Sequence, residues 1–123
     1  MYHLSMLRAL LVLGLLTLAS CMGRKPVPPG ATGAEIYVLQ NCRLCHAEDG
    51  SGTKRGPALK GLRENWTVER LVDYLFDPQP IVDADERLSA LDEQFSLPMP
   101  RYHNLTEEHR RELGRFLLDQ YGD

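Results

Sequence analysis

The 123-residue sequence is poor in the features that several common functions require. Lys and Arg do not outnumber Asp and Glu, and the formal net charge of −3 gives no support to nucleic-acid binding. Aromatic residues make up only 7% of the chain, with a single Trp, and much of its Leu lies near the N-terminus. The chain after residue 20 therefore has a thin apolar core for its length, and we expect a cofactor or staple to complete it.

No apolar run in the sequence is long enough to cross a membrane. The run at residues 9–19 covers 11 residues, whereas a membrane-spanning helix needs about 20. Arg8 precedes this run, and its last two residues begin the Leu-Ala-Ser-Cys sequence at residues 18–21, a combination typical of an export signal. We expect residues 1–20 to be a signal peptide, and the alternative is a short buried helix.

Only three Cys are present, and Cys21 follows the export signal directly. Residues 18–21 resemble the lipobox of bacterial lipoproteins, in which the Cys is lipidated and becomes the first residue of the mature protein. The alternative, ordinary cleavage, would leave a lone thiol in an oxidising compartment. We expect an exported lipoprotein that faces the periplasm, anchored through Cys21 to the outer membrane or to the outer leaflet of the inner membrane.

Residues 21–32 are rich in Pro and Gly and have no hydrophobic periodicity. Such a sequence predicts an extended tether, with a reach of roughly 35 to 40 Å at ~3.1 Å per residue. We find no internal repeat beyond it. The expected organisation is a single domain over residues 33–123.

The other two Cys belong to Cys42-Arg43-Leu44-Cys45-His46, a C-x-x-C-H sequence typical of covalent haem attachment. Two Cys three positions apart lie on one side of a helical turn and can form thioethers with both vinyl groups of one porphyrin, beside a His that can bind iron. The alternatives are a thioredoxin-like redox pair and half of a zinc site. A zinc site would need a further ligand, such as His103 or His109. A redox pair usually follows a strand, whereas a helical pattern precedes this one.

Hydrophobic spacing predicts helices on both sides of this motif. Thr32 and Glu35 form a T-x-x-E capping box, which predicts a helix from Gly33 into the Cys pair. Further helices are predicted over residues 67–76, over residues 83–95, and after Thr106 as the N-cap.

Residues 33–121 resemble the class I c-type cytochromes, a family of small mono-haem proteins. The family has its attachment motif near the N-terminus and a Met ligand near the C-terminus. The resemblance implies an all-α fold of three to five helices around one haem c, bound through Cys42 and Cys45. It also implies a crossing of the terminal helices, which Gly114 would allow near Gly33 or Tyr37.

The resemblance also implies the ligands of the haem iron. His46 would be the proximal ligand, and the Pro57 carbonyl in Gly56-Pro57-Ala58-Leu59 would accept a hydrogen bond from its ring and fix its orientation. Met99, held between two Pro residues, matches the family's distal ligand. The alternatives are that Pro57 is only a turn residue, that Met99 fills a gap in the core, and that His103 takes the distal position.

An iron with both axial positions filled has no site for substrate. The expected function is therefore one-electron transfer by a monomeric carrier between redox protein partners, and not enzymatic catalysis. The competing functions are a gas sensor or small peroxidase in which Met99 is displaced, and a fixed haem subunit of a larger oxidase or dehydrogenase. Arg101 and His103 lie so near Met99 that we expect them to shape its loop instead of forming a distal acid–base pair.

Overall fold

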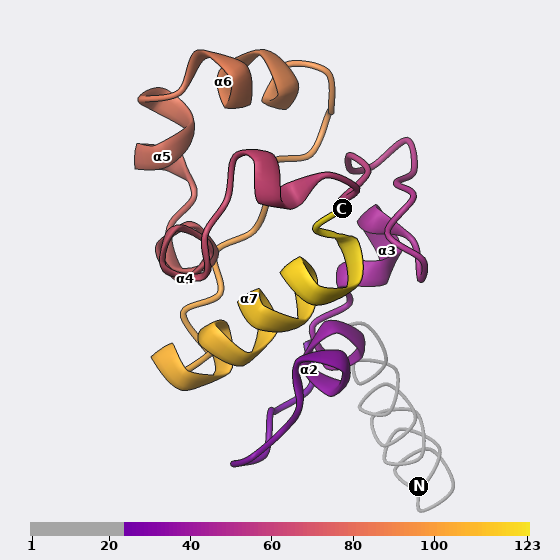
Figure 1. The fold of residues 1–123 in the computed structure, drawn as a ribbon, viewed down its shortest axis with the longest axis vertical. Helices are drawn as coiled ribbons and strands as arrows, with labels where there is room; N and C mark the ends of the chain where they lie inside the picture. The colour runs from indigo at the N-terminus through magenta and orange to yellow at the C-terminus, as the bar shows by residue number, and fades with distance from the viewer. Residues whose placement is uncertain (1–23) are drawn as a thin grey trace, which may run out of the picture.

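A computed structural model describes residues 24–123, so the predictions for the export signal and for Cys21 lie outside the described residues. Within them the fold is all-α, as expected, and an isolated bridge between Thr53 and Gly56 is the only β pairing (Figure 1). None of the described helices is long and apolar enough to cross a membrane. In chain order the elements are α2 (Gly33–Leu39), α3 (Cys42–His46), the 3-10 helix η1 (Leu62–Glu64), α4 (Val68–Phe76), α5 (Gln79–Asp83), α6 (Glu86–Asp92) and α7 (Glu107–Tyr121).

The first of these helices starts as the capping box predicts. The Thr32 hydroxyl accepts a hydrogen bond from the Glu35 amide at 3.3 Å, and the Glu35 carboxylate accepts one from the Thr32 amide at 2.7 Å. The prediction that this helix runs into the Cys pair is wrong. Asn41 adopts a left-handed conformation with φ of 62°, which Asn tolerates better than most residues, and this separates α2 from α3.

The middle of the chain also differs from the prediction in its helix boundaries. The helix predicted over residues 67–76 is present as α4, with Thr67 as its N-cap. The helix predicted over residues 83–95 is shorter, because the Asp85 carboxylate accepts a hydrogen bond from the Leu88 amide at 3.1 Å and so starts α6 later. The additional helix α5 has Pro80 in its first turn, where the missing N–H is tolerated. Because α5 is additional and α2 is separate from α3, residues 24–123 form six α-helices, more than the three to five expected.

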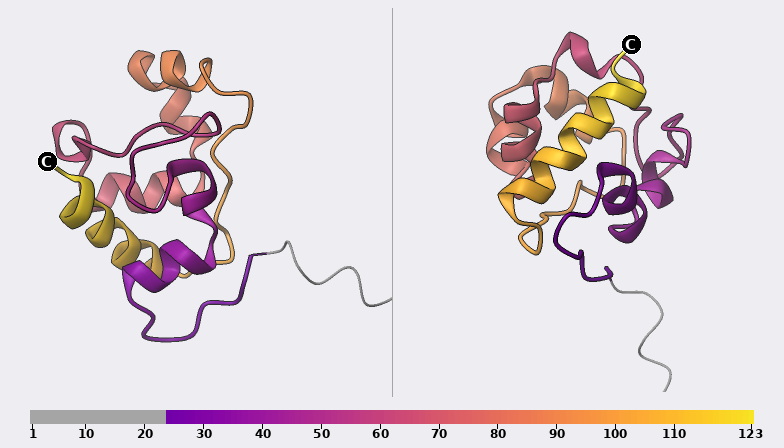
Figure 2. Two further views of the ribbon diagram at one scale, coloured as in Figure 1. Left: turned by 90° about the vertical axis from the view of Figure 1, so that its right-hand side faces the viewer. Right: turned by 60° about the horizontal axis from the view of Figure 1, so that its bottom comes forward.

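The C-terminal helix α7 packs against both α2 and α4 (Figures 1 and 2). It starts after Thr106, as expected, and buries Leu113 and Leu117. It lies so near Gly33 of α2 that an added Cβ there would collide with the side chain of Phe116. The terminal helices therefore cross as the resemblance implies.

The prediction for Gly114 is wrong. This residue faces α4 and not α2, and an added Cβ would lie 3.4 Å from the Cβ of Leu71 and 3.7 Å from the side chain of Val68. Those distances are ordinary van der Waals contacts. The small residue that the helix crossing requires is Gly33, at the start of α2.

Residues 24–32, which we name the N-terminal strap, contact the domain at several points and are not a free tether. The Lys25 amide donates to the Leu39 carbonyl at 3.2 Å, and the Lys25 carbonyl accepts from the side chain of Gln40 at 2.9 Å. Val27 packs on the core and Ala31 is buried. The Pro and Gly content of this segment predicted an extended backbone without contacts to the domain. That prediction missed Gln40, the C-cap residue of α2, whose buried side chain bonds to the backbone of the strap.

Replacement of the two Gly residues by Ala should have different effects on stability. We expect Gly33→Ala to lower the free energy of unfolding by about 2 kcal/mol, because the new methyl group overpacks the crossing. Gly114→Ala should leave it unchanged or raise it by up to about 1 kcal/mol, because Ala favours a helix interior. Urea denaturation of the two variants measures both values. Equal destabilisation by the two substitutions would contradict this description of the crossing.

Candidate functional site

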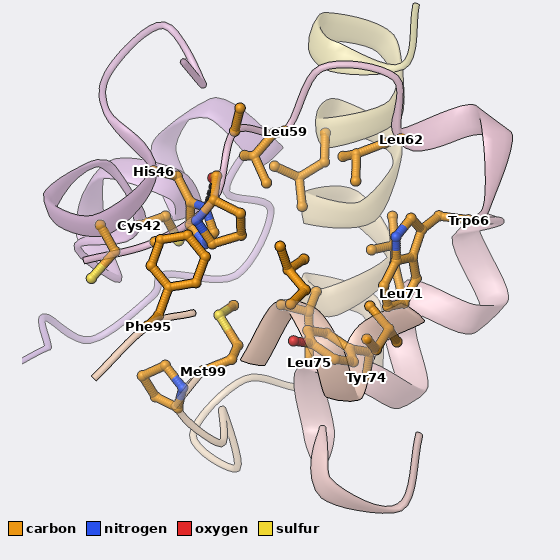
Figure 3. A pocket seen from close by; sticks show the side chains of 18 of the residues that line it. Cys42, His46, Leu59, Leu62, Trp66, Leu71, Tyr74, Leu75, Phe95 and Met99 are labelled. Carbon is orange, nitrogen blue, oxygen red and sulfur yellow. Dashed lines mark hydrogen bonds between the residues drawn. The ribbon is translucent and has the colours of Figure 1, made fainter. Parts of the chain in front are cut away.

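The C-x-x-C-H sequence forms α3, on the wall of a cavity in the centre of the domain (Figure 3). Cys42 and His46 are buried, and Cys45 also lines the cavity. The two Cys are free of any disulfide. Burial raises the pKa of the Cys42 thiol to about 12, so this thiol is neutral at physiological pH and suits an apolar wall.

The ring of His46 is held by a backbone carbonyl. Its Nδ1 lies 2.8 Å from the carbonyl oxygen of Pro57. A carbonyl can only accept, so Nδ1 carries the proton and Nε2 keeps a free lone pair. Burial also lowers the pKa of His46, which favours the neutral imidazole that binds metals. The contact that the resemblance implies for Pro57 is present in the structure.

The loop after α3 brings Pro57 to this position. The Gly52 amide donates to the His46 carbonyl at 2.9 Å, and the Thr53 hydroxyl donates to the Cys45 carbonyl at 2.7 Å. Gly52 has φ of 83°, and an added Cβ would lie 2.9 Å from the carbonyl carbon of Pro57. Only Gly fits where the loop folds back so closely on itself.

Met99 reaches the same cavity from the C-terminal part of the chain. It is half-buried, packs against the core and lines the cavity together with His46 (Figure 3). We name residues 95–105 the Met99 loop. After Met99 this loop is fixed to α4, because the Tyr102 amide donates to the Leu75 carbonyl at 2.9 Å.

The rival distal ligand, His103, is not among the residues that line the cavity. It is exposed, and its ring stacks on that of Phe76 with 4.5 Å between the centroids. Arg101 also lies outside the cavity lining, and its Nε is 3.1 Å from a carboxylate oxygen of Asp77. The fold does not bring these two residues together as a distal acid–base pair.

Two further alternatives find no support in residues 24–123. No strand precedes the Cys pair, as a thioredoxin-like site would require. No three His, Cys, Asp or Glu side chains in this range are grouped so that they could hold a metal ion, as a zinc site would require. His109, considered as a zinc ligand, instead has its Nε2 3.2 Å from the carbonyl of Pro28 in the N-terminal strap.

The cavity has a volume of about 600 Å³ and a mostly apolar wall. Packed domains keep few voids larger than a water molecule, whereas cofactor pockets span roughly 300–1,000 Å³. Burial raises the pKa of Tyr74 to about 12, so its hydroxyl is uncharged. The cavity wall includes Leu59, Leu62, Trp66, Leu71, Tyr74, Leu75, Val82 and Leu88.

Sequence reasoning did not identify two residues that contribute to this wall. Tyr102 is 3% exposed, and the guanidinium carbon of Arg24 lies 4.4 Å from the centre of its ring. The position of Tyr102 three residues after Met99 was a signal that could have identified it. Arg24 lies in a Pro/Gly-rich segment without periodicity, and no pattern there indicated a role in the site.

Comparison with known proteins gives one match. The family model described as Cytochrome c matches residues 30–120, a range that holds the Cys pair and Met99. No curated protein and no solved structure matches the chain. A cytochrome c domain carries covalently bound haem c, and Cys42 and Cys45 have the spacing that this attachment needs.

The residues present fit a haem. The cavity is apolar and of cofactor size, two thiols lie on its wall, and a neutral imidazole and a thioether enter it from separate parts of the chain. The haem is thus the group that fills the centre of the domain and compensates for the thin apolar core.

Loss of both attachment sites should therefore unfold the chain. We expect a Cys42→Ser, Cys45→Ser double variant to lose most of its helical circular dichroism, because the apolar wall would be left without the group that it surrounds. Arg43→Ser, an exposed change between the two Cys, should keep the signal of the parent. Native helix content in the haem-free double variant would refute this account.

Proposed function

The chain belongs to the cytochrome c family and is a haem-binding electron carrier, and from this premise we propose that His46 and Met99 are the axial ligands of its iron. The bound haem supplies the one-electron chemistry, Fe(III) to Fe(II) and back. The observation that carries the proposal is that His46 and Met99 line one cavity whereas His103 does not.

In this proposal Pro57 orients the proximal ligand. Its carbonyl keeps the proton on Nδ1 of His46, so that Nε2 is the atom available to iron. Such a hydrogen bond also raises the basicity of the imidazole. The loop contacts of Gly52 and Thr53 hold both partners in place through backbone atoms.

Met99 is the second proposed ligand of the iron, and it comes from the C-terminal part of the chain. A His/Met ligand pair raises the reduction potential, and the thioether favours the less charged Fe(II) state. Pro98 and Pro100 restrict the backbone on both sides of Met99, so that the sulfur is held by a loop without a helix to position it.

With His46 and Met99 bound to it, the iron would have no free position for water or substrate, and the mostly apolar wall would keep water away from it. A gas sensor or peroxidase would need an open distal position, and a peroxidase also needs acid–base groups beside it. Arg101 and His103 point to other partners at Asp77 and Phe76. This favours an electron carrier over a gas sensor or a peroxidase. We propose that it exchanges single electrons with separate redox proteins as a monomer.

We further propose that Cys21 is lipidated and anchors the carrier to a membrane on its periplasmic side. The packing of the N-terminal strap changes the expected reach of this anchor. From Cys21 to Arg24, where the packed chain begins, three residues span at most about 11 Å. The domain would stay close to the membrane surface and would not rotate on a long tether.

The ligand proposal is tested by optical spectra of the mature haem protein. The parent should be low-spin, with a thioether-to-iron band in the oxidised state and no binding of carbon monoxide in the reduced state. Met99→Ala should abolish the band and allow carbon monoxide to bind, whereas His103→Ala, a change in the same loop, should leave both properties unchanged. A high-spin parent, or a band that survives Met99→Ala, would refute His/Met ligation.

The anchor is tested by intact mass and detergent partition after expression in a bacterial host with lipoprotein-processing and haem-attachment enzymes. We expect the parent to lack residues 1–20, to carry the added mass of acyl chains and to enter the detergent phase. Cys21→Ser should remain in the aqueous phase, and Met22→Ser, which keeps the thiol, should behave like the parent. An unacylated parent in the aqueous phase would rule out the anchor.

A further inference from the structure

We propose that Arg24 is a positioning residue, whose guanidinium holds the Met99 loop closed over the haem cavity. This inference rests on the proposed function, in which Met99 binds the iron. It gives a specific role to the N-terminal strap, a segment that the sequence alone predicted to be free of the domain.

The contacts of Arg24 all fall on the stretch of the loop just after Met99. Its Nη1 donates to the Arg101 carbonyl at 2.7 Å and lies 3.4 Å from the side-chain oxygen of Asn104. Its guanidinium carbon lies 4.4 Å from the centre of the Tyr102 ring. One side chain therefore contacts three nearby residues of the loop.

The other end of this connection is fixed to α2 by Gln40. Its side chain is 2% exposed and donates to the Lys25 carbonyl at 2.9 Å. Its carbonyl oxygen accepts from the Asn104 side-chain amide at 2.7 Å. Strap, α2 and loop thus meet at one buried amide, and the neighbouring Arg24 adds its own contacts with the loop.

The end of the loop is also held by the Tyr102 amide on Leu75, by Asn104 on Gln40, and by Arg110, whose Nη1 donates to the Leu105 carbonyl at 2.7 Å. The stretch around Met99 itself has weaker contacts. The ion pair between Arg101 and Asp77 is largely exposed to solvent, where such pairs contribute about 0–1 kcal/mol. Leu97 is 55% exposed, and both Pro98 and Pro100 are exposed. The bond from Arg24 to the Arg101 carbonyl is also exposed, but it is charge-assisted, and the contact with the buried Tyr102 ring adds a cation–π interaction.

Release of Met99 from the iron requires this loop to move away from the cavity. An added ligand such as imidazole can bind Fe(III) only in the open state, so its apparent affinity reports how often the loop opens. Loss of the Arg24 contacts should raise the open fraction. The neighbouring Lys25 offers a matched control, because its contacts with the domain are made by its backbone.

The experiment uses the mature haem protein and the variants Arg24→Ala and Lys25→Ala, each of which removes one positive charge. We expect imidazole to bind ferric Arg24→Ala about tenfold more tightly than the parent, and Lys25→Ala to stay within about twofold. Hydrogen exchange is the second measurement. The amides of Tyr102 and Leu105, both bonded within or beside the loop, should exchange faster in Arg24→Ala alone.

The two measurements separate this proposal from the ligand proposal. Equal imidazole affinity and equal exchange in the two variants would overturn the role of Arg24, even where the parent shows a thioether-bound iron. A parent without the thioether band would overturn Met99 ligation instead. Hydrogen exchange would then decide the role of Arg24, since it detects loop opening whichever residue binds the iron.

Discussion

The helices of this chain surround a space of about 600 Å³ that their own side chains do not fill. The rest of the structure depends on this constraint, because core residues of α4 and α7, among them Leu71, Leu75, Leu113 and Leu117, line the space. A haem that fills it completes the hydrophobic core at the same time as it provides the redox centre. Folding and cofactor binding are therefore coupled, and a group that binds only the folded state stabilises it. A chain with so few aromatic residues has too little apolar side-chain volume to fill this space, and it needs a cofactor for that reason.

The two proposed ligands are held in different ways. His46 lies in the attachment motif, and its ring and backbone are fixed by Pro57 and Gly52 within the next eleven residues of sequence. Met99 lies on a loop whose position depends on contacts with distant parts of the chain, at Leu75 and Arg24. His46 is thus held in place by residues close to it in sequence. Met99 is held in place only by contacts between its loop and distant parts of the chain. Changes far from the iron in sequence should affect the distal side first.

The features that the sequence predicted well are those set by neighbouring residues. The capping box at Thr32, the start of α4 after Thr67 and the start of α7 after Thr106 need only a side chain and the next turn of backbone. The features that it did not predict depend on tertiary packing. Asn41 ends a helix that the hydrophobic spacing alone would continue. The N-terminal strap packs because the buried side chain of Gln40 donates a hydrogen bond to the Lys25 carbonyl. At the site, the C-x-x-C-H spacing and the resemblance named His46, Pro57 and Met99, but nothing local indicated Arg24.

The central claim is that iron in this chain is bound by one imidazole and one thioether. X-ray absorption at the iron edge of the purified mature protein measures this directly, because sulfur and nitrogen scatter differently in the first coordination shell. With His46 and Met99 as ligands, we expect five nitrogen neighbours, four from the porphyrin and one from His46, together with one sulfur from Met99, in both oxidation states. Six nitrogen or oxygen neighbours, or a five-coordinate iron without sulfur, would contradict it.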